Sequence, residues 1–337
     1  MNNRTITIGA VAIVALAAIF YFASSQKKVS EDIKVGILLG FTGPIESLTP
    51  DMASGAELAF NEASNSGELL GGSKITILRA DSTCVDSAAA TAAAEDLLSQ
   101  GMTAMMGADC SGVTGAVATN VAVPNGFVMI SPSATSPGLT DLEDKGMFFR
   151  TAPSDARGGQ VLADITNDKG IKSVAITYVN SDYGLGLADV YKAAVEAYGI
   201  TVTTMASHES DKADYSADVG VLSSAGGDAL AVLGYLDNAG GHIIEGSLDS
   251  GAFDTFVLSD GMIGDSLTDR FGSDLNNSFG SMPGSLGEGA QLFKSVAEAG
   301  GINASVYVGE SYDAAALIVL AMQAGKSSDK GSIAENI

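Results

Sequence analysis

Cysteine, histidine and basic residues are scarce in this chain. Its 337 residues include two Cys, two His and 17 Lys plus Arg. Cys84, Cys110, His208 and His242 lie too far apart in sequence to give the ligand spacings of a zinc site. We therefore expect neither a metal site nor a metal cofactor.

The shortage of basic residues also limits the possible partners. Asp and Glu number 40 against the 17 basic residues, which gives a formal net charge of -23. Such a chain repels phosphate backbones, so nucleic-acid binding is not expected. No GxxxxGK[ST] sequence occurs, and Gly184 and Gly186 lack the third glycine of a dinucleotide-binding fingerprint. No nucleotide cofactor is therefore predicted.

Only one apolar run is long enough to direct export. It extends from about Ile6 to Ala23, follows Arg4 and ends in small residues. This pattern predicts a signal peptide over residues 1–25, although the length of the run also allows an uncleaved membrane anchor. We expect a periplasmic or otherwise extracytoplasmic protein, in which an even pair of cysteines favours a disulfide over a metal site.

Short apolar runs alternate with Ala-rich segments of helical period along the rest of the chain. The runs in the first half are IKVGILL, KITILRA, TAMMG and FVMIS, and the pattern restarts after FFRTAPSD with KSVAITYV, ITVTTMA, DALAVLG and TFVLSD. Runs that are apolar throughout are typical of parallel strands buried on both faces. We predict an α/β fold with two doubly wound parallel-sheet lobes joined by a hinge.

The segments between the strands are expected to be helices with one apolar face. In the first of these, Met52, Ala56 and Phe60 recur at helical spacing, and Asp51 is the expected N-cap. Further helices are predicted over Leu185–Ala197, Ser216–Ser224 and Ala290–Ala324.

The last predicted helical segment would return to the first lobe. Lobe 1 would then comprise residues 33–150 plus 284–337, and lobe 2 residues 151–283. Pro153 and the turn-rich segment 278–285 mark the two places where the chain would cross between the lobes.

One motif suggests an enzyme. Gly264 to Leu267 spell GDSL, in which Ser266 would be the nucleophile of an esterase. In that family the motif lies near the start of the mature chain and the His follows it, whereas both His here precede Ser266. We therefore expect no enzymatic activity.

Six segments in order carry a resemblance to a known family. They are KVGILLGFTGP, DSTC with GADCS, SPSATSPGLT, FFRTAPSD, YVNSDYGLGLA and ESYDAAALIVLA. Together with the export signal, they resemble the type I periplasmic substrate-binding proteins, specifically the leucine/isoleucine/valine-binding family that serves ABC importers. The likeness runs from about Ile33 to the end of the chain.

The resemblance implies a set of ligand-binding residues at the carboxyl ends of the strands. Ser111 and Thr135 would bind the α-carboxylate, a carbonyl at Ser133 and the acid Asp260 would bind the ammonium group, and two tyrosines would close over the ligand. The full expected set is Ser111, Ser133, Ala134, Thr135, Tyr183, Tyr235 and Asp260. It also implies a disulfide between Cys84 and Cys110. Roles as helix caps, turn residues or packing remain the alternatives for these side chains.

The chain departs from the family pattern at several points. Leu48 stands where relatives often carry an aromatic residue, and Asp260 stands where close relatives have the longer Glu. The chain ends at Ile337, and we expect this end to fall short of the family's last strands, so that lobe 1 would be incomplete. These departures leave the ligand open among branched-chain and other amino acids, urea and short amides.

The expected function is therefore an extracytoplasmic solute-binding protein of an ABC importer. It would bind an amino acid between its lobes by hinge closure, act as a monomer and deliver the ligand to a membrane permease. The alternative is a ligand-sensing ectodomain held by an uncleaved N-terminal helix.

Overall fold

The computed structural model describes residues 32–285 and 287–337. The predicted signal peptide or anchor, residues 1–25, lies outside this part of the chain. Among the described residues, no helix combines the length and the apolar character that a membrane span requires.

The first lobe is built on a parallel sheet of five strands in the order β2-β1-β3-β4-β5. β1 pairs with β2 over its whole length, with Asp32 opposite Lys74 and Leu39 opposite Asp81. The strands are β1 (Asp32–Leu39), β2 (Lys74–Asp81), β3 (Ala104–Gly107), β4 (Met129–Ser131) and β5 (Phe148–Arg150). β3 and β4 are buried throughout, as their apolar sequences predict, whereas the edge strand β2 is half-buried.

The second lobe repeats this arrangement. Its strands are also parallel, in the order β10-β9-β8-β6-β7, which is the first lobe's order read from the other edge. They are β6 (Ser173–Val179), β7 (Thr201–His208), β8 (Ala229–Leu233), β9 (Phe256–Leu258) and β10 (Phe279–Gly280). The predicted α/β fold with two parallel-sheet lobes is confirmed.

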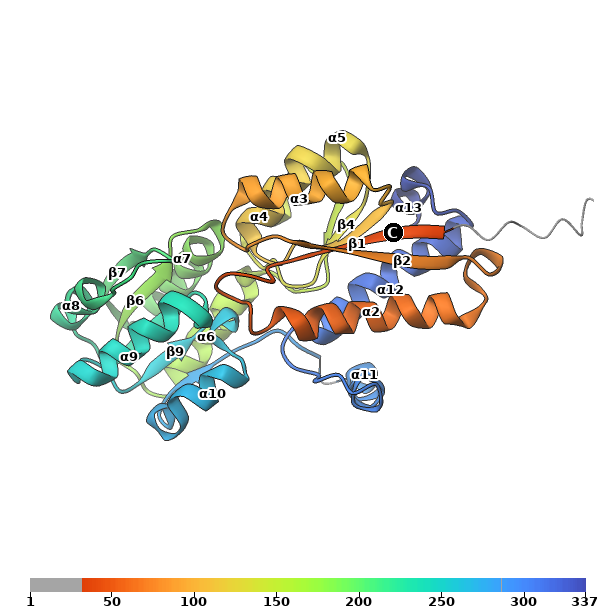
Figure 1. Cartoon of the computed structure of the whole chain (residues 1–337). Helices are drawn as coiled ribbons and strands as arrows, with labels where there is room; N and C mark the ends of the chain where they lie inside the picture. The colour runs from red at the N-terminus through yellow and green to blue at the C-terminus, as the bar shows by residue number, and fades with distance from the viewer. Residues whose placement is uncertain (1–31, 286) are drawn as a thin grey trace, which may run out of the picture.

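Figure 1 shows the lobes side by side, with α12 returning to the first lobe beside α2 and α13 next to α12. In the first lobe the helices are α2 (Thr49–Ser66), α3 (Ser87–Ser99), α4 (Ser111–Val117), α5 (Val123–Asn125), α12 (Val308–Gly325) and α13 (Lys330–Asn336). In the second they are α6 (Asp155–Asp168), α7 (Asp182–Ala197), α8 (Ser216–Ala225), α9 (Gly241–Ser250) and α10 (Asp265–Phe271), with α11 (Glu288–Ala299) on the way back. α12 packs along α2, and α6 packs on α7. The residue-level lobe boundaries, 33–150 plus 284–337 and 151–283, stay a prediction.

Two helix predictions were wrong in detail. Asp51 lies in the first turn of α2 and is not its N-cap, because Pro50 at the start fixes a helical φ and the helix begins one turn earlier, after Leu48. The helical segment expected over Ala290–Ala324 is two helices. Gly301 adopts a φ of +73° just beyond α11, a conformation that ends a helix.

In both sheets, the direction in which successive strands are added reverses at one point. In the order 2-1-3-4-5, the connections leave the first strand toward opposite edges, so a crevice opens at the carboxyl ends of β1 and β3, and likewise at β6 and β8. The segments that follow β3, β6 and β8 carry three of the seven residues expected to bind a ligand, and the other four follow β4 and β9.

Candidate functional site

The edge of lobe 1 is held together by a disulfide and a buried carboxylate. Cys84, after β2, and Cys110, after β3, form the predicted disulfide. Asp109 is 1% exposed and accepts hydrogen bonds from the amides of Gly40 and Cys110 and from the Ser82 hydroxyl. It thereby joins the loops that follow β1, β2 and β3. Burial raises its pKa above the usual value, and these hydrogen bonds oppose the rise.

The residues expected to bind a carboxylate lie directly beside this edge. Ser111 opens α4, is 2% exposed, and its Oγ accepts the amide of Ser136 at 3.1 Å. Thr135 is equally buried. The Ser133 hydroxyl donates to the carbonyl of Asp109 at 3.1 Å, and the Ala134 carbonyl accepts from Arg150 at the same distance.

The lobe 2 side of the site is centred on Asp260, which follows β9. Its carboxylate accepts a hydrogen bond from the Tyr183 hydroxyl at 2.6 Å on one oxygen and from the Tyr307 hydroxyl on the other. Asp260 is 7% exposed, and burial raises its pKa although both phenols lower it. The rings of Tyr183 and Tyr235 stack with centroids 5.2 Å apart. Gly261 permits this packing, because a Cβ there would lie 2.5 Å from the carbonyl of Gly234.

A small cavity lies between these two groups of residues. It is lined by five of the seven expected ligand-binding residues, namely Ser111, Ser133, Tyr183, Tyr235 and Asp260. Ala134 and Thr135 do not line it. Ile45, Leu48 and Met52 from lobe 1 give it an aliphatic wall. Its volume is about 20 Å³, room for about one water molecule.

Two polar residues of this region were missed by the sequence analysis. Tyr307 precedes α12 and reaches Asp260 from a left-handed backbone conformation, with φ of +65°. Asp155 opens α6 and is buried beside Asp260. Tyr307 lies just before the segment ESYDAAALIVLA, and Asp155 is the last residue of FFRTAPSD. Both residues therefore lie within or next to segments that carry the resemblance to the family. Their contact with Asp260 depends on tertiary packing and had no local signal.

The residues of the GDSL motif and the histidines lie in other surroundings. Ser266 is in the first turn of α10, where its hydroxyl is 3.4 Å from Asp237. His208 is buried and hydrogen-bonds Thr177 through Nδ1, and burial lowers its pKa to about 4. His242 stacks on Tyr215. Within the described residues, neither His208 nor His242 forms a hydrogen bond with Ser266.

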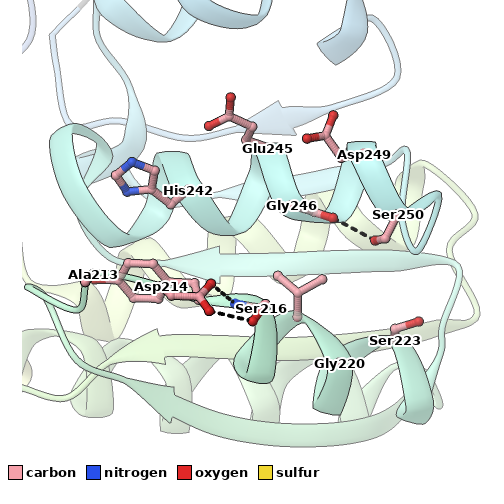
Figure 2. A pocket seen from close by; sticks show the side chains of 12 residues that line it. Ala213, Asp214, Ser216, Gly220, Ser223, His242, Glu245, Gly246, Asp249 and Ser250 are labelled. Atoms are coloured by element: carbon pink, nitrogen blue, oxygen red, sulfur yellow. Dashed lines mark hydrogen bonds between the residues drawn. The ribbon is translucent and has the colours of Figure 1, made fainter.

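A larger hollow of about 440 Å³ lies between α8 and α9. Figure 2 shows its side chains, among them His242, Glu245 and Asp249. Its hydrogen bonds include those from Ser216 to Asp214 and from Ser250 to Gly246. It contains none of the expected ligand-binding residues.

Comparisons with known proteins agree with this geometry. The family model for periplasmic binding proteins matches residues 32–337. Leu/Ile/Val-binding protein homolog 1 of Brucella melitensis is 30% identical over 329 residues, which cover 96% of this chain and 85% of that protein. Homolog 3 of the same organism is 32% identical over 255 residues, or 73% of this chain, and the match spans 64% of that relative, less than two thirds of its length.

A solved structure shows the same architecture. The branched-chain amino acid transporter substrate-binding protein LivJ of Streptococcus pneumoniae, in complex with isoleucine, matches with a TM-score of 0.78 and 25% identity. The match covers 91% of this chain and 87% of that one. The chain therefore belongs to the type I periplasmic binding protein family, in the branch of the Leu/Ile/Val-binding proteins.

Proposed function

We propose that this protein is the extracytoplasmic substrate-binding component of an ABC importer and that it binds a branched-chain amino acid in the cavity between its lobes. The observation that carries the proposal is the pairing of an aliphatic wall, Ile45, Leu48 and Met52, with a buried carboxylate, Asp260, in one enclosed space. An ammonium group needs a carboxylate partner when it leaves water, and an aliphatic side chain needs an apolar surface.

The proposed roles follow the geometry of the two lobes. The Ser111 hydroxyl and the polar groups of the loop 133–135 bind the α-carboxylate, since this side of the cavity offers hydroxyl and amide donors. Asp260, held by Tyr183, binds the ammonium group from the other lobe. Urea and short amides carry no formal positive charge to offset Asp260, so we rank them below amino acids.

Binding requires the lobes to move apart. A cavity of about 20 Å³ cannot admit an amino acid, because ligand pockets are about an order of magnitude larger. We propose that the ligand enters an open form and that closure brings Asp260, Tyr183 and Tyr235 onto it. The closed form would then be the one recognised by the membrane permease.

Three related ligands test the proposal by isothermal titration calorimetry. They are L-leucine, 4-methylpentanoate, which is leucine without its amino group, and 3-methylbutylamine, which lacks the carboxylate. We expect L-leucine, L-isoleucine or L-valine to bind and both truncated ligands to bind at least about 100-fold more weakly, because each leaves a buried polar group without its partner. A folded protein that binds none of the 20 standard amino acids would refute the proposal.

Variants assign the two ends of the ligand. Ser111→Ala should weaken amino acid binding about tenfold by removing one hydrogen bond to a charged group, and Asp260→Asn by about 30-fold or more. Ser99→Ala at the exposed end of α3 and Asp269→Asn on the exposed face of α10 are the matched controls. Binding that is unchanged in Asp260→Asn would show that Asp260 does not hold the ammonium group.

A further inference from the structure

One buried carboxylate in the wall of the ligand cavity has no part in the proposed function. Asp109 lines this cavity beside Cys110 and Ser111, and it is 1% exposed. None of the ion pairs among the described residues includes Asp109. A buried carboxylate is costly unless hydrogen bonds compensate for the water it has lost, so the partners of Asp109 indicate what it does.

The hydrogen bonds of Asp109 come from loops that follow four different strands. The Gly40 amide, after β1, donates to Oδ2, and the Ser82 hydroxyl, after β2, donates to Oδ1 at 2.8 Å. The Cys110 amide, after β3, also donates to Oδ1, at 2.9 Å. The backbone carbonyl of Asp109 accepts from the Ser133 hydroxyl, after β4, at 3.1 Å. One residue therefore links the ends of four strands of lobe 1.

This set of hydrogen bonds leads directly to the hydroxyl assigned to the ligand's carboxylate. Cys110 is the N-cap of α4 but gives the helix no side-chain capping hydrogen bond, and Ser111 is the first helical residue. The amide that Asp109 binds therefore lies immediately before Ser111. The Ser111 Oγ accepts the amide of Ser136 at 3.1 Å, and its own hydrogen can donate to a ligand.

The groups around the Asp109 side chain require an acceptor at both of its oxygens. Two N–H groups and one O–H group donate to it, so a side chain with a donor of its own would face another donor. Asn has nearly the same shape as Asp, but its NH₂ group would leave at least one of these buried donors without an acceptor. Asp109→Asn therefore changes the hydrogen bonds with little change in side-chain volume.

We propose that Asp109 is a positioning residue for ligand binding, which holds the loops after β1, β2 and β3 so that the Ser111 hydroxyl is already oriented for the ligand's carboxylate. The inference rests on the proposed function, because it assumes that a carboxylate binds at Ser111. All the hydrogen-bond partners named for Asp109 belong to lobe 1, so closure of the lobes is not needed to form this arrangement. A site that is ordered before binding gives higher affinity, because less freedom is lost when the ligand arrives.

A double-mutant cycle on the full chain, measured by isothermal titration calorimetry with L-leucine, tests the inference. Asp109→Asn should weaken binding about tenfold when Ser111 is present. In the Ser111→Ala background, the same change should weaken binding by less than about twofold, because the hydroxyl through which Asp109 acts is already absent. A residue that only stabilises the fold would have the same effect in both backgrounds.

The matched control is a carboxylate that also accepts backbone amides but lies elsewhere. Asp228 accepts the amides of Lys172 and Ser173 at 2.8 and 2.9 Å, at the amino ends of β6 and β8 in lobe 2. Asp228→Asn should leave the affinity for L-leucine unchanged in both backgrounds.

Amide hydrogen exchange, followed by NMR in the ligand-free protein, gives a second measurement. The Ser136 amide donates to Ser111 Oγ and not to Asp109, so its exchange rate reports on the position of the Ser111 hydroxyl. Asp109→Asn should accelerate exchange of the Ser136 amide about fivefold or more. Asp228→Asn should not change it.

A milder variant serves if Asp109→Asn does not fold. Ser82→Ala leaves the carboxylate in place and removes one of its three donors. It should weaken L-leucine binding about threefold, and this loss should again disappear in the Ser111→Ala background.

The outcomes separate this inference from the proposed function. If Asp109→Asn binds L-leucine as tightly as the wild type, or if it loses the same affinity with and without the Ser111 hydroxyl, the inference is wrong and the proposed function stands. A loss that depends on Ser111, with faster exchange of the Ser136 amide, supports it. If the folded wild type binds no amino acid, the proposed function fails, and unchanged exchange of the Ser136 amide in Asp109→Asn would show that Asp109 does not position Ser111 either.

Discussion

At the scale of single residues, the site depends on how each buried carboxylate is partnered. Asp109 accepts hydrogen bonds from two amides and a hydroxyl, so its partners all come from the chain. Asp260 accepts from two phenols that leave its charge uncompensated. Burial and Asp260 raise the pKa of Asp155, and the Thr135 hydroxyl lowers it. Asp109 is thus partnered within the chain, whereas neither Asp155 nor Asp260 forms an ion pair among the described residues.

Tyr307→Phe tests how the Asp260 carboxylate is positioned. The change removes one of its two phenolic donors and leaves the ring in place, so the ionised form of Asp260 loses stabilisation and its pKa rises further. We expect amino acid affinity to fall about tenfold, the value of one hydrogen bond to a charged group. Calorimetric titration measures it.

The control for this variant lies in α12, the helix that Tyr307 precedes. The Tyr312 hydroxyl donates to Glu62 at the surface, at 2.7 Å, and Tyr312→Phe should leave affinity unchanged. Equal effects of the two substitutions would mean that Tyr307 acts through the packing of α12 and not through Asp260.

At the scale of elements, the edge of lobe 1 that faces the cavity is made of loops. Without a covalent link, these loops would be free to separate. The segments after β2 and β3 flank the end of β1, and the disulfide between Cys84 and Cys110 joins them across 26 residues of sequence. Ser111, the first residue of α4, directly follows the second cysteine. The position of the Ser111 hydroxyl is therefore coupled to the disulfide.

Replacing both cysteines with serine should lower the free energy of unfolding by about 3 kcal/mol, the chain-entropy value for a loop of this size. Urea denaturation of the double variant, compared with the oxidised wild type, measures the loss. We also expect weaker ligand binding, because the loop that presents Ser111 gains freedom. A double variant with wild-type stability would show that the hydrogen bonds of Asp109 are sufficient to hold this edge.

At the scale of the whole molecule, the closed form is stabilised by contacts that lie outside the ligand cavity. Asp237 of lobe 2 accepts from the amide and the hydroxyl of Ser47 of lobe 1, at 2.9 and 2.8 Å, and its own amide donates to the carbonyl of Pro44. Neither Ser47 nor Asp237 lines the cavity. These hydrogen bonds form only when the lobes are close together, so they favour closure whatever the ligand is.

Asp237→Ala should therefore shift the molecule toward the open form. The loss of two hydrogen bonds at a solvent-accessible position predicts a Kd that rises about threefold to tenfold, mainly through faster dissociation. Small-angle X-ray scattering should show a larger radius of gyration for the ligand-free variant. Asp254→Ala, at an exposed position of the same lobe, is the control. A variant with unchanged scattering and affinity would show that these hydrogen bonds do not affect closure.

The sequence alone was sufficient to predict the two parallel-sheet lobes, the disulfide and the family. Strands buried on both faces must be apolar, and the β-α alternation is a local pattern that repeats, so each strand was visible without its neighbours. The resemblance to the family, on polar segments that follow these strands, implied Ser111, Ser133, Tyr183, Tyr235 and Asp260, which the structure brings around one cavity. Their roles as ligand contacts remain predictions.

The tertiary structure alone decided which charges lie in the site together. Asp155, Asp260 and Tyr307 are separated by long stretches of sequence, and each taken singly has the pattern of a helix start or a loop residue. Their contact comes from the docking of the two lobes. Each lobe forms its own sheet, so no local sequence pattern predicts that docking. The energetic consequence of burying two carboxylates side by side arises only after docking, because it depends on water being excluded between the lobes.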